Sequence, residues 1–497
     1  MRFSRSLMPT RRLLLALCFC SLFATHGSRV AAAADAAPPK VNILFAIADD
    51  WGPHHASAYG DAVVKTPTFD RIAREGALFT HAFCTSPSCT PSRSAILTGQ
   101  YHWRLDSGAN LYAVFGNRFA TYPELLRVTG YQLGASGKTW GPGRTERPGR
   151  QLMGPRYEDF PAFLAKRDVA KPFCYWLGSG DPHRDYDPGS GKRSGMDLSK
   201  IHVPAFFPDN ELVRSDIADY YFEVQRFDAL VGKALAALEA AGELDNTIVV
   251  MTSDHGMPFP RAKSNIYDYG AKVPLAIRWP KHVKAGRRVE DFVNLTDMAP
   301  TFLAAAGMHP PARMTGRSLM PVLKSASSGL VDPSRDKVFF GKERHVASQT
   351  WPDYGGYPCR AIRTKDFLYI RNYRIDRWPA GNANHRGAAV PGGWYADCDN
   401  GPTKRYMIDN VHKDLLHRQL FDLSFGLRPA EELYDLAKDP EQVRNVAGVE
   451  KYEEQKAALA AELTRELLES EDPREVGGGD KFDRYHYFGG APLYKNR

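Results

Sequence analysis

The sequence lacks the features that mark several special classes of protein. Of its 497 residues, 43% are hydrophobic and 25% are charged, with no internal repeat, so the composition excludes a disordered chain. The apolar run at residues 13–23 is too short to cross a bilayer comfortably. The formal charge is only +8, and it falls to about +3 without the five arginines of residues 1–34. We therefore expect no nucleic-acid partner.

The N-terminus has the layout of a secretory signal peptide over residues 1–34. Four arginines precede the apolar run, and the small residues 31–34 provide cleavage sites. Leu17 stands before Cys18, where a lipoprotein site needs a small residue, so we expect no membrane anchor. Export predicts a mature chain in the periplasm or outside the cell.

Cysteine is scarce, with seven residues in the whole chain. Cleavage of the signal peptide removes two of them. The five that remain are Cys84, Cys89, Cys174, Cys359 and Cys398. An odd number in an exported protein indicates one thiol that is not meant to pair, and Cys89 is the candidate. The other four are either buried thiols or members of disulfide bridges.

Apolar runs that end in polar turns predict an α/β fold. We expect buried strands at residues 41–48, 131–135, 173–177 and 247–252, and helices at residues 66–77, 121–128 and 213–241. This alternation predicts a large domain at residues 40–324, in which helices cover both faces of a mostly parallel sheet. The polar clusters follow strand ends, where open α/β sheets place their sites.

The pattern of predicted secondary structure changes after about residue 321. A polar linker at residues 325–336 precedes short strands near residues 339, 362 and 368–373 and a helix near 450–468. These segments predict a smaller α+β domain with an antiparallel sheet at residues 337–475. We expect the glycine- and aromatic-rich tail, residues 476–497, to be loose or draped over the surface.

Residues 89–99 read Cys-Thr-Pro-Ser-Arg-Ser-Ala-Ile-Leu-Thr-Gly. Thr90 is suited to cap a helix and Pro91 to occupy its first position, so we expect a helix to start beside Cys89. Arg93 projects from the same face. An anion there would meet backbone N–H groups, a guanidinium and a reactive side chain. The alternative is an idle thiol of low pKa at a helix start.

Two acidic clusters follow predicted strands. Asp49 and Asp50 end the first strand, and Asp254 with His255 ends a later one. Three carboxylates and an imidazole suit calcium or, less well, magnesium, whereas zinc would need thiolate or several histidine ligands. Taken alone, an Asp-Asp pair is more often a turn or a helix cap.

The stretch from Cys89 resembles the signature Cys-x-Pro-Ser-Arg-x-x-x-Leu-Thr-Gly of the formylglycine-dependent sulfatases, in the alkaline-phosphatase-like superfamily. That resemblance implies that a maturation enzyme oxidises Cys89 to formylglycine, an aldehyde whose hydrate attacks sulfur. It also implies that calcium is bound by Asp49, Asp50, Asp254, His255 and the oxidised Cys89. The same resemblance implies that Arg93 is a catalytic cation.

The resemblance extends to the rest of the pocket. Lys138 in Gly137-Lys138 matches the lysine that contacts sulfate, Lys263 matches a second cation, and His183 matches a histidine that protonates the leaving group. The family histidine two residues after the first lysine is replaced by Trp140, so the base that regenerates the aldehyde has no obvious candidate. A lone histidine such as His183 is more often structural.

Several further segments resemble the heparan N-sulfatase branch, which acts on N-sulfoglucosamine. Asp181 and Arg184 flank His183 and are expected either to touch the sugar or to pair with each other. His345 and Arg363 are expected either to select the saccharide or to belong to a salt-bridged interface. Three alternative functions stay open: an O-sulfatase on another sulfated polysaccharide, a phosphodiesterase of the same superfamily, and a protein that binds sulfated glycans without turning them over.

Overall fold

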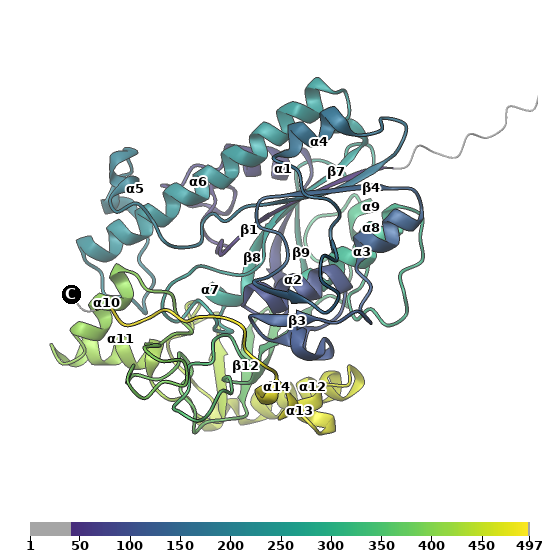
Figure 1. Ribbon diagram of the computed structural model, residues 1–497. Coiled ribbons are helices and arrows are strands. Elements are labelled where there is room, and N and C mark those ends of the chain that lie inside the picture. The colour runs from purple at the N-terminus through teal and green to yellow at the C-terminus, as the bar shows by residue number, and fades with distance from the viewer. Residues whose placement is uncertain (1–40, 496–497) are drawn as a thin grey trace, which may run out of the picture. The chain divides into compact units, whose positions relative to one another are not determined.

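A seven-stranded sheet forms the centre of the larger part of the molecule (Figure 1). The computed structural model describes residues 41–495. The strand order is β4-β6-β1-β7-β8-β2-β9, and only β8 runs antiparallel to its neighbours. These strands are β1 (Asn42–Ala48), β2 (Ala77–Phe83), β4 (Gln132–Ser136), β6 (Phe173–Gly178), β7 (Thr247–Ser253), β8 (Lys272–Arg278) and β9 (Arg287–Asn294). The mostly parallel sheet is confirmed, and the reversed strand was not foreseen.

The apolar run of β1 is buried on both sides because alternate residues face two cores. Ile43, Phe45 and Ile47 pack with α2, α3 and α8. Leu44 and Ala46 pack with α1, α4 and α6. The helices of this part are α1 (Pro67–Glu75), α2 (Cys89–Thr98), α3 (Tyr122–Val128), α4 (Phe160–Lys166), α5 (Ser190–Arg193), α6 (Glu211–Ala240), α7 (Asp268–Ala271), α8 (Met298–Ala305) and α9 (Met320–Lys324). Helices therefore cover both faces of the sheet, as expected.

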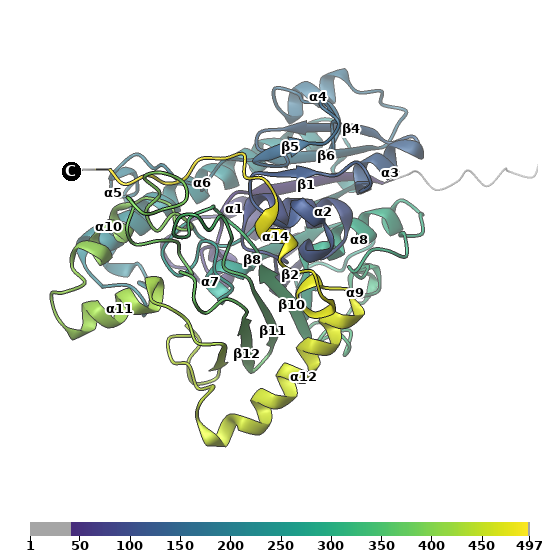
Figure 2. The same cartoon turned by 60° about the horizontal axis from the view of Figure 1, so that its bottom comes forward.

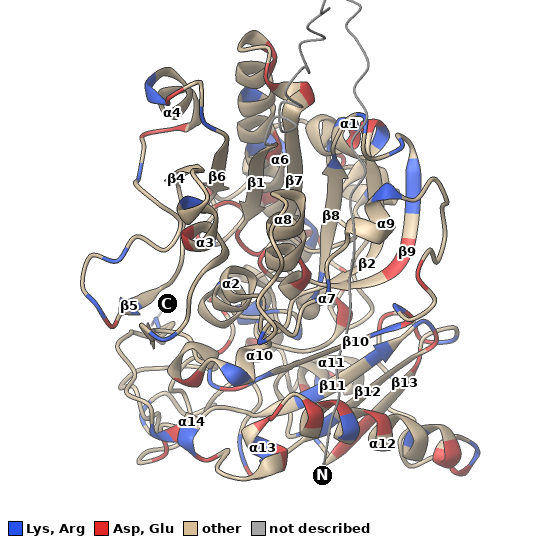
Figure 3. Cartoon of the chain, turned by 90° about the vertical axis from the view of Figure 1, so that its right-hand side faces the viewer, with Lys and Arg blue, Asp and Glu red and all other residues tan. Residues whose placement is uncertain are grey.

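A separate antiparallel sheet of four strands follows in the order β10-β11-β12-β13 (Figure 2). Leu459, Leu463 and Leu467 recur at helical spacing along α12 and pack on one face of this sheet. Charged residues recur along α12 (Figure 3), and Glu453, Glu454, Arg465 and Glu469 among them are exposed. The bounds are β10 (Lys337–Lys342), β11 (Cys359–Thr364), β12 (Phe367–Asn372), β13 (Glu431–Asp435), α10 (Pro402–Asp409), α11 (Leu415–Phe425), α12 (Glu453–Glu469), α13 (Pro473–Val476) and α14 (Lys481–Arg484). The predicted antiparallel sheet is confirmed, while the domain limits stay a prediction.

Within residues 476–495, the C-terminal tail lies against the rest of the molecule, which agrees with the draped alternative and not with the loose one. Phe482 of α14 is fully buried among residues of the second sheet and α12. Beyond it, residues 490–492 reach the cavity described below. A short two-stranded sheet of β3 (Ala113–Phe115) and β5 (Gly143–Thr145) lies at the same cavity, because residues just before each strand line it.

None of the helices within residues 41–495 is both long and apolar enough to cross a membrane. The predicted signal peptide lies outside the described residues. All five cysteines of the described chain are buried and free, so the four that might have formed bridges are thiols.

Candidate active site

The carboxylates of the site come from the ends of two neighbouring strands. In the parallel pair β1–β7, Ala48 lies opposite Ser253, so the residues that follow each strand meet at one edge of the sheet. The backbone N–H of Asp50 donates to Asp254 Oδ1 at 3.2 Å. Asp50 has a φ of 74°, a left-handed conformation that costs a residue with a side chain about 1 kcal/mol and recurs at functional sites.

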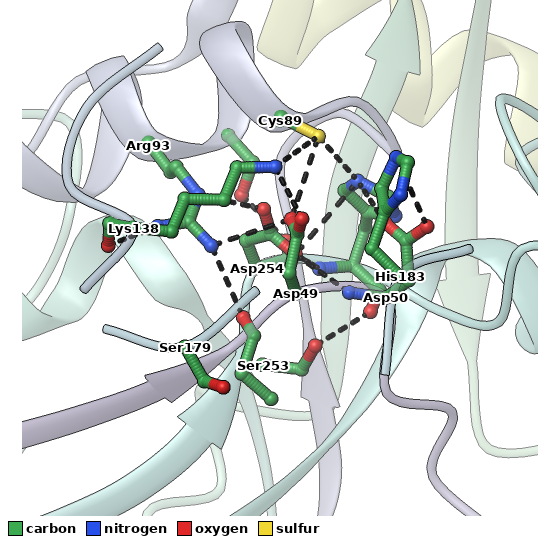
Figure 4. Close-up of polar contacts among 12 residues, drawn as sticks. Asp49, Asp50, Cys89, Arg93, Lys138, Ser179, His183, Ser253 and Asp254 are labelled. Atoms are coloured by element: carbon green, nitrogen blue, oxygen red, sulfur yellow. Dashed lines mark hydrogen bonds and ion pairs between the residues drawn. The ribbon is translucent and has the colours of Figure 1, made fainter. Parts of the chain in front are cut away.

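Cys89 lies directly above these carboxylates (Figure 4). Its Sγ is 3.5 Å from Asp49 Oδ1, 3.5 Å from His255 Nε2 and 3.3 Å from Lys138 Nζ. Burial, reinforced by the nearby Asp49 carboxylate, raises the pKa of the Cys89 thiol. The unmodified side chain is therefore a neutral thiol, which contradicts the low pKa expected in the alternative of an idle thiol.

The helix starts two positions earlier than predicted. α2 begins at Cys89 itself, with Ser88 at the preceding cap position. Thr90, predicted as the cap, is inside the helix, and its hydroxyl donates to the carbonyl of Pro142. Cys89 is therefore on the first turn, at the positive end of the helix dipole.

Arg93 lies beneath the site and is fully buried. Its Nε donates to Asp254 Oδ2 at 2.7 Å, and one Nη lies 3.4 Å from Asp49 Oδ1. The other Nη donates to the carbonyls of Lys138 at 3.2 Å and Thr139 at 2.9 Å. Although burial opposes ionisation of Asp254, Arg93 holds the pKa of that carboxyl well below its usual range. In this geometry the guanidinium supports the acidic cluster and does not line the cavity.

Lys138 follows β4 and forms an ion pair with Asp49. Burial acts to lower the pKa of Lys138, but the Asp49 carboxylate outweighs it and raises that pKa. Two glycines fix the backbone here. A Cβ on Gly137, which has a φ of 64°, would lie 1.9 Å from the carbonyl oxygen of Gly178, and a Cβ on Gly178 would lie 1.7 Å from that of Lys138. Only glycine fits at either position.

Lys263 approaches from the other side of the acidic cluster. Its Nζ is 2.5 Å from Asp50 Oδ2 and 3.3 Å from Asp399 Oδ2. Burial disfavours the charged amine, but Asp399 and Asp50 outweigh it and raise the pKa of Lys263. His183 Nε2 lies 3.9 Å from both carboxylates, and its side chain is one-third exposed. The ammonium and the imidazole thus share two carboxylate partners.

Asp399 is the site residue that sequence reasoning missed. It lies in the polar loop Asp397-Cys398-Asp399-Asn400, and that run of polar residues ahead of a helix was the available signal. Burial opposes its ionisation, yet Lys263 and His183 hold the pKa of Asp399 well below its usual range. Asp399 is therefore a carboxylate that keeps two predicted site residues together.

A cavity of about 570 Å³ opens above these groups. Its lining residues are Cys89, Leu111, Tyr112, Lys138, Trp140, Gly141, Pro142, His183, Lys263, His345, Val346, Asp399, Gly490, Ala491 and Pro492. Trp140, which departs from the family pattern, lies in the wall, where its Nε1 donates to Ser94 Oγ at 2.7 Å. His345 faces Ser88 Oγ at 2.8 Å, and burial lowers its pKa to about 3. His345 is therefore neutral.

Three of the predicted substrate contacts lie elsewhere. Arg184 does not pair with Asp181: it is buried against Asp216, with N–O distances of 2.7 and 2.8 Å, and is not part of the cavity lining. Asp181 lies 3.6 Å from Arg226 instead. Arg363 forms a buried two-pronged pair with Asp268, at 3.0 and 2.9 Å. The donors of Arg363 are thus already used within the protein, in the kind of buried salt bridge that was the alternative to saccharide selection.

The acidic cluster fits a divalent cation. Ligand atoms of Asp49, Cys89, Asp254 and His255 all lie within 4.8 Å of one another. Asp50 Oδ1 is buried and accepts no hydrogen bond from any residue between 41 and 495, with His255 Nε2 3.1 Å away. Such an oxygen is costly to bury unless a cation takes its lone pair. Carboxylate oxygens are the donors that hard divalent ions prefer.

Comparisons with known proteins agree with this geometry. A family model described as sulfatase matches residues 41–308, and one described as N-sulphoglucosamine sulphohydrolase, C-terminal, matches residues 258–380. The N-sulphoglucosamine sulphohydrolase of Homo sapiens is 28% identical, over 87% of this chain and 91% of its own. An ulvan-active sulfatase of Formosa agariphila is 27% identical, over 86% of this chain and 75% of its own.

Solved structures share the fold. A protein in complex with its substrate D-glucosamine-2-N,6-O-disulfate superposes with a TM-score of 0.64 and 22% identity, over 87% of this chain and 98% of its own. The phosphonate monoester hydrolase of Agrobacterium radiobacter gives a TM-score of 0.63 and 20% identity, over 86% of this chain and 96% of its own. Since the sulfatase model spans more than half of the residues and includes both strand ends of the site, the chain belongs to the sulfatase family.

Proposed function

We propose that this sulfatase removes sulfate from a sulfated glycan, with N-sulfoglucosamine as the first candidate substrate. Water is consumed, the S–O or S–N bond breaks, and the sugar leaves with a hydroxyl or an amine. The observation that carries the proposal is the position of Cys89 at the floor of the cavity, between the ammonium of Lys138 and the carboxylates of a cation site. A sulfate anion and a nucleophile need that combination of charges.

Cys89 is the proposed site of formylglycine, formed by a maturation enzyme. The hydrated aldehyde would supply an oxygen nucleophile for sulfur, and a divalent cation, proposed to be calcium, would supply positive charge. Asp49, Asp50, Asp254 and His255 are proposed to hold that cation.

The cavity residues have distinct proposed roles. Lys138 and Lys263 are charged because carboxylates raise their pKa values, so they offset the negative charge of the sulfate. His183 is proposed to protonate the departing oxygen or nitrogen, since its ring is one-third exposed to the cavity. Asp399 orients His183 and Lys263 from the opposite side. Arg93 supports the acidic cluster from below rather than touching sulfate.

The glycan substrate is supported by the names of relatives, among them the human N-sulphoglucosamine sulphohydrolase and the ulvan-active sulfatase. An O-sulfatase on another polysaccharide is the second candidate. The similarity in fold to a phosphonate monoester hydrolase keeps phosphoryl substrates as the competitor to be assayed. We further propose export to the periplasm or the cell exterior through the predicted signal peptide.

A paired substitution tests the proposal. Cys89→Ala should abolish hydrolysis of 4-nitrophenyl sulfate and of N-sulfoglucosamine, whereas Cys359→Ala, which removes another buried thiol from β11, should leave turnover unchanged. Mass spectrometry of the peptide that contains residue 89 should detect the aldehyde. Full activity of Cys89→Ala, or faster turnover of the matching phosphate ester than of the sulfate ester, would refute the proposed function.

A further inference from the structure

We propose that the C-terminal segment at residues 486–495 is a fixed wall of the catalytic cavity and restricts hydrolysis to sulfate on a terminal sugar of the glycan. This inference rests on the proposed glycan sulfatase function. The segment leaves α14 and runs across the molecule as an extended strip (Figure 2). Gly490, Ala491 and Pro492 line the cavity that has Cys89 at its floor.

The strip is anchored before the cavity by a buried arginine. Arg344 donates to the carbonyls of Tyr485 at 2.7 Å and His486 at 3.4 Å. Its guanidinium also lies over the ring of Tyr487, 5.4 Å from the ring centroid. Arg344 precedes His345, which itself lines the cavity, so the same loop holds both the strip and one side of the site.

A second anchor lies beyond the cavity. The side-chain amide of Asn400 donates to the carbonyl of Leu493 at 2.9 Å, and the N–H of Tyr494 donates to the carbonyl of Gly392 at 2.8 Å. The N–H of Trp394 donates to the carbonyl of Pro492 at 3.2 Å. Asn400 directly follows Asp399, so this anchor is also tied to a loop that carries a charged group of the site. Anchors at both ends make the strip part of the fold.

Between the anchors, the strip packs directly on Tyr112, another residue of the cavity wall. The two rings of Tyr112 and Tyr487 meet edge to face with centroids 5.5 Å apart. A Cβ built on Gly489 would lie 2.2 Å from the ring of Tyr112, which is inside van der Waals contact. Residue 489 must therefore be glycine for the strip to lie this close to the wall.

The strip shares the lining of the cavity with segments from elsewhere in the chain. These include Trp140, Gly141 and Pro142 ahead of β5, and His345 and Asp399 from two loops. The volume of about 570 Å³ falls within the range for pockets that hold one small ligand. Cys89 at the floor is only 3% exposed. A glycan chain lying across the surface cannot bring an internal sulfate to that depth, whereas a chain end can enter.

Two oligosaccharides test this inference, one sulfated only on its terminal sugar and one only on an internal sugar. The complete enzyme should favour the terminal sulfate by about 100-fold in kcat/KM. A variant ending at Tyr485, and the full-length variant Gly489→Ala, should each lower this preference by about tenfold or more. Both should keep their activity on 4-nitrophenyl sulfate, because the strip supplies no charged group to the reacting centre. Gly448→Ala adds a methyl that meets nothing within 4 Å and serves as the matched control.

The outcomes separate the inference from the function on which it rests. If the complete enzyme hydrolyses internal and terminal sulfates equally well, or if Gly489→Ala keeps the full preference, the strip is not a selectivity wall and the sulfatase function stands. If no sulfated substrate is turned over, including 4-nitrophenyl sulfate, the proposed function itself fails. Gly489→Ala decides the matter even if the shortened chain does not fold.

Discussion

Replacing Arg93 by lysine tests whether this residue supports the acidic cluster or acts on the substrate. The guanidinium is fully buried and divides its donors between the carboxylates of Asp254 and Asp49 and the carbonyls of Lys138 and Thr139. A lysine keeps the charge but offers a single nitrogen in place of the planar fork, so it can serve only one side of this network.

The magnitude follows from the hydrogen bonds that the substitution removes. A hydrogen bond to a charged group contributes about 1.5–3 kcal/mol, and Arg93→Lys gives up at least the pair of bonds to carbonyl oxygens, so we expect a decrease of about 3 kcal/mol in the free energy of unfolding. Arg93→Ala leaves the buried carboxylate of Asp254 without its arginine partner, while Asp49 keeps Lys138, and should cost about 3–5 kcal/mol. Either decrease is a large part of a typical total stability of about 5–15 kcal/mol.

Denaturant unfolding and calorimetric titration with calcium measure the two consequences. Arg93→Lys should weaken calcium binding by about 10–100-fold, as removal of a group that orients metal ligands commonly does. Arg335→Lys is the matched control, because Arg335 is also buried, pairs with Asp297 at 2.7 Å and donates to three carbonyls, yet lies outside the site. It should reduce stability to a similar extent with unchanged calcium affinity. Wild-type unfolding and calcium affinity in an inactive Arg93→Lys enzyme would refute the supporting role.

Three further predictions concern protons and the cation. His183→Ala should slow hydrolysis of a sugar sulfate by about 10²–10⁴-fold but 4-nitrophenyl sulfate far less, since nitrophenolate leaves without a proton; equal decreases on both would contradict the role of proton donor. Dialysis against a chelator should abolish turnover, with calcium restoring it better than magnesium; full activity of the metal-free enzyme would exclude the cation site. Burial raises the pKa of Asp228 to about 6, despite two backbone N–H donors. Between about pH 4 and 6 the carboxyl is therefore protonated in the folded state but ionised in the unfolded state. The free energy of unfolding consequently falls as the pH rises through this range. Measured by denaturant unfolding, the stability of Asp228→Asn relative to wild type should therefore rise by up to about 3 kcal/mol from pH 4 to pH 7, and a constant difference would contradict this.

The features predictable from sequence are those set by local patterns. The apolar run of β1 must be buried on both faces, and its end must lie beside the ends of parallel neighbours. That reasoning brings Asp49 and Asp254 to one place from the sequence alone. The same logic fails for β8, because an apolar strand carries no mark of its direction.

Contacts between segments that are distant in the sequence could not be predicted from local sequence patterns. His345 and Arg363 are alike as polar residues near predicted strands, yet His345 follows β10 at the cavity while Arg363 points from β11 to Asp268. Asp399 lies in a loop without regular structure, so no periodicity placed it near Lys263. The glycine-rich tail has the composition of a flexible segment, and its packing was not predictable because it depends on the ring of Tyr112, which is remote in sequence.

The interlocked glycines beneath Lys138 have a consequence for evolving this enzyme toward other substrates. Because Gly137 and Gly178 each leave no room for a methyl group, neither can change unless the other backbone moves, and a single mutation cannot achieve that. The backbone that positions Lys138 is therefore resistant to single substitutions at these two glycines. The C-terminal segment at residues 490–492 differs, because a Cβ built on Gly490 would meet nothing within 4 Å. Selection for a new glycan should accumulate its substitutions there and leave the sulfate-facing side unaltered.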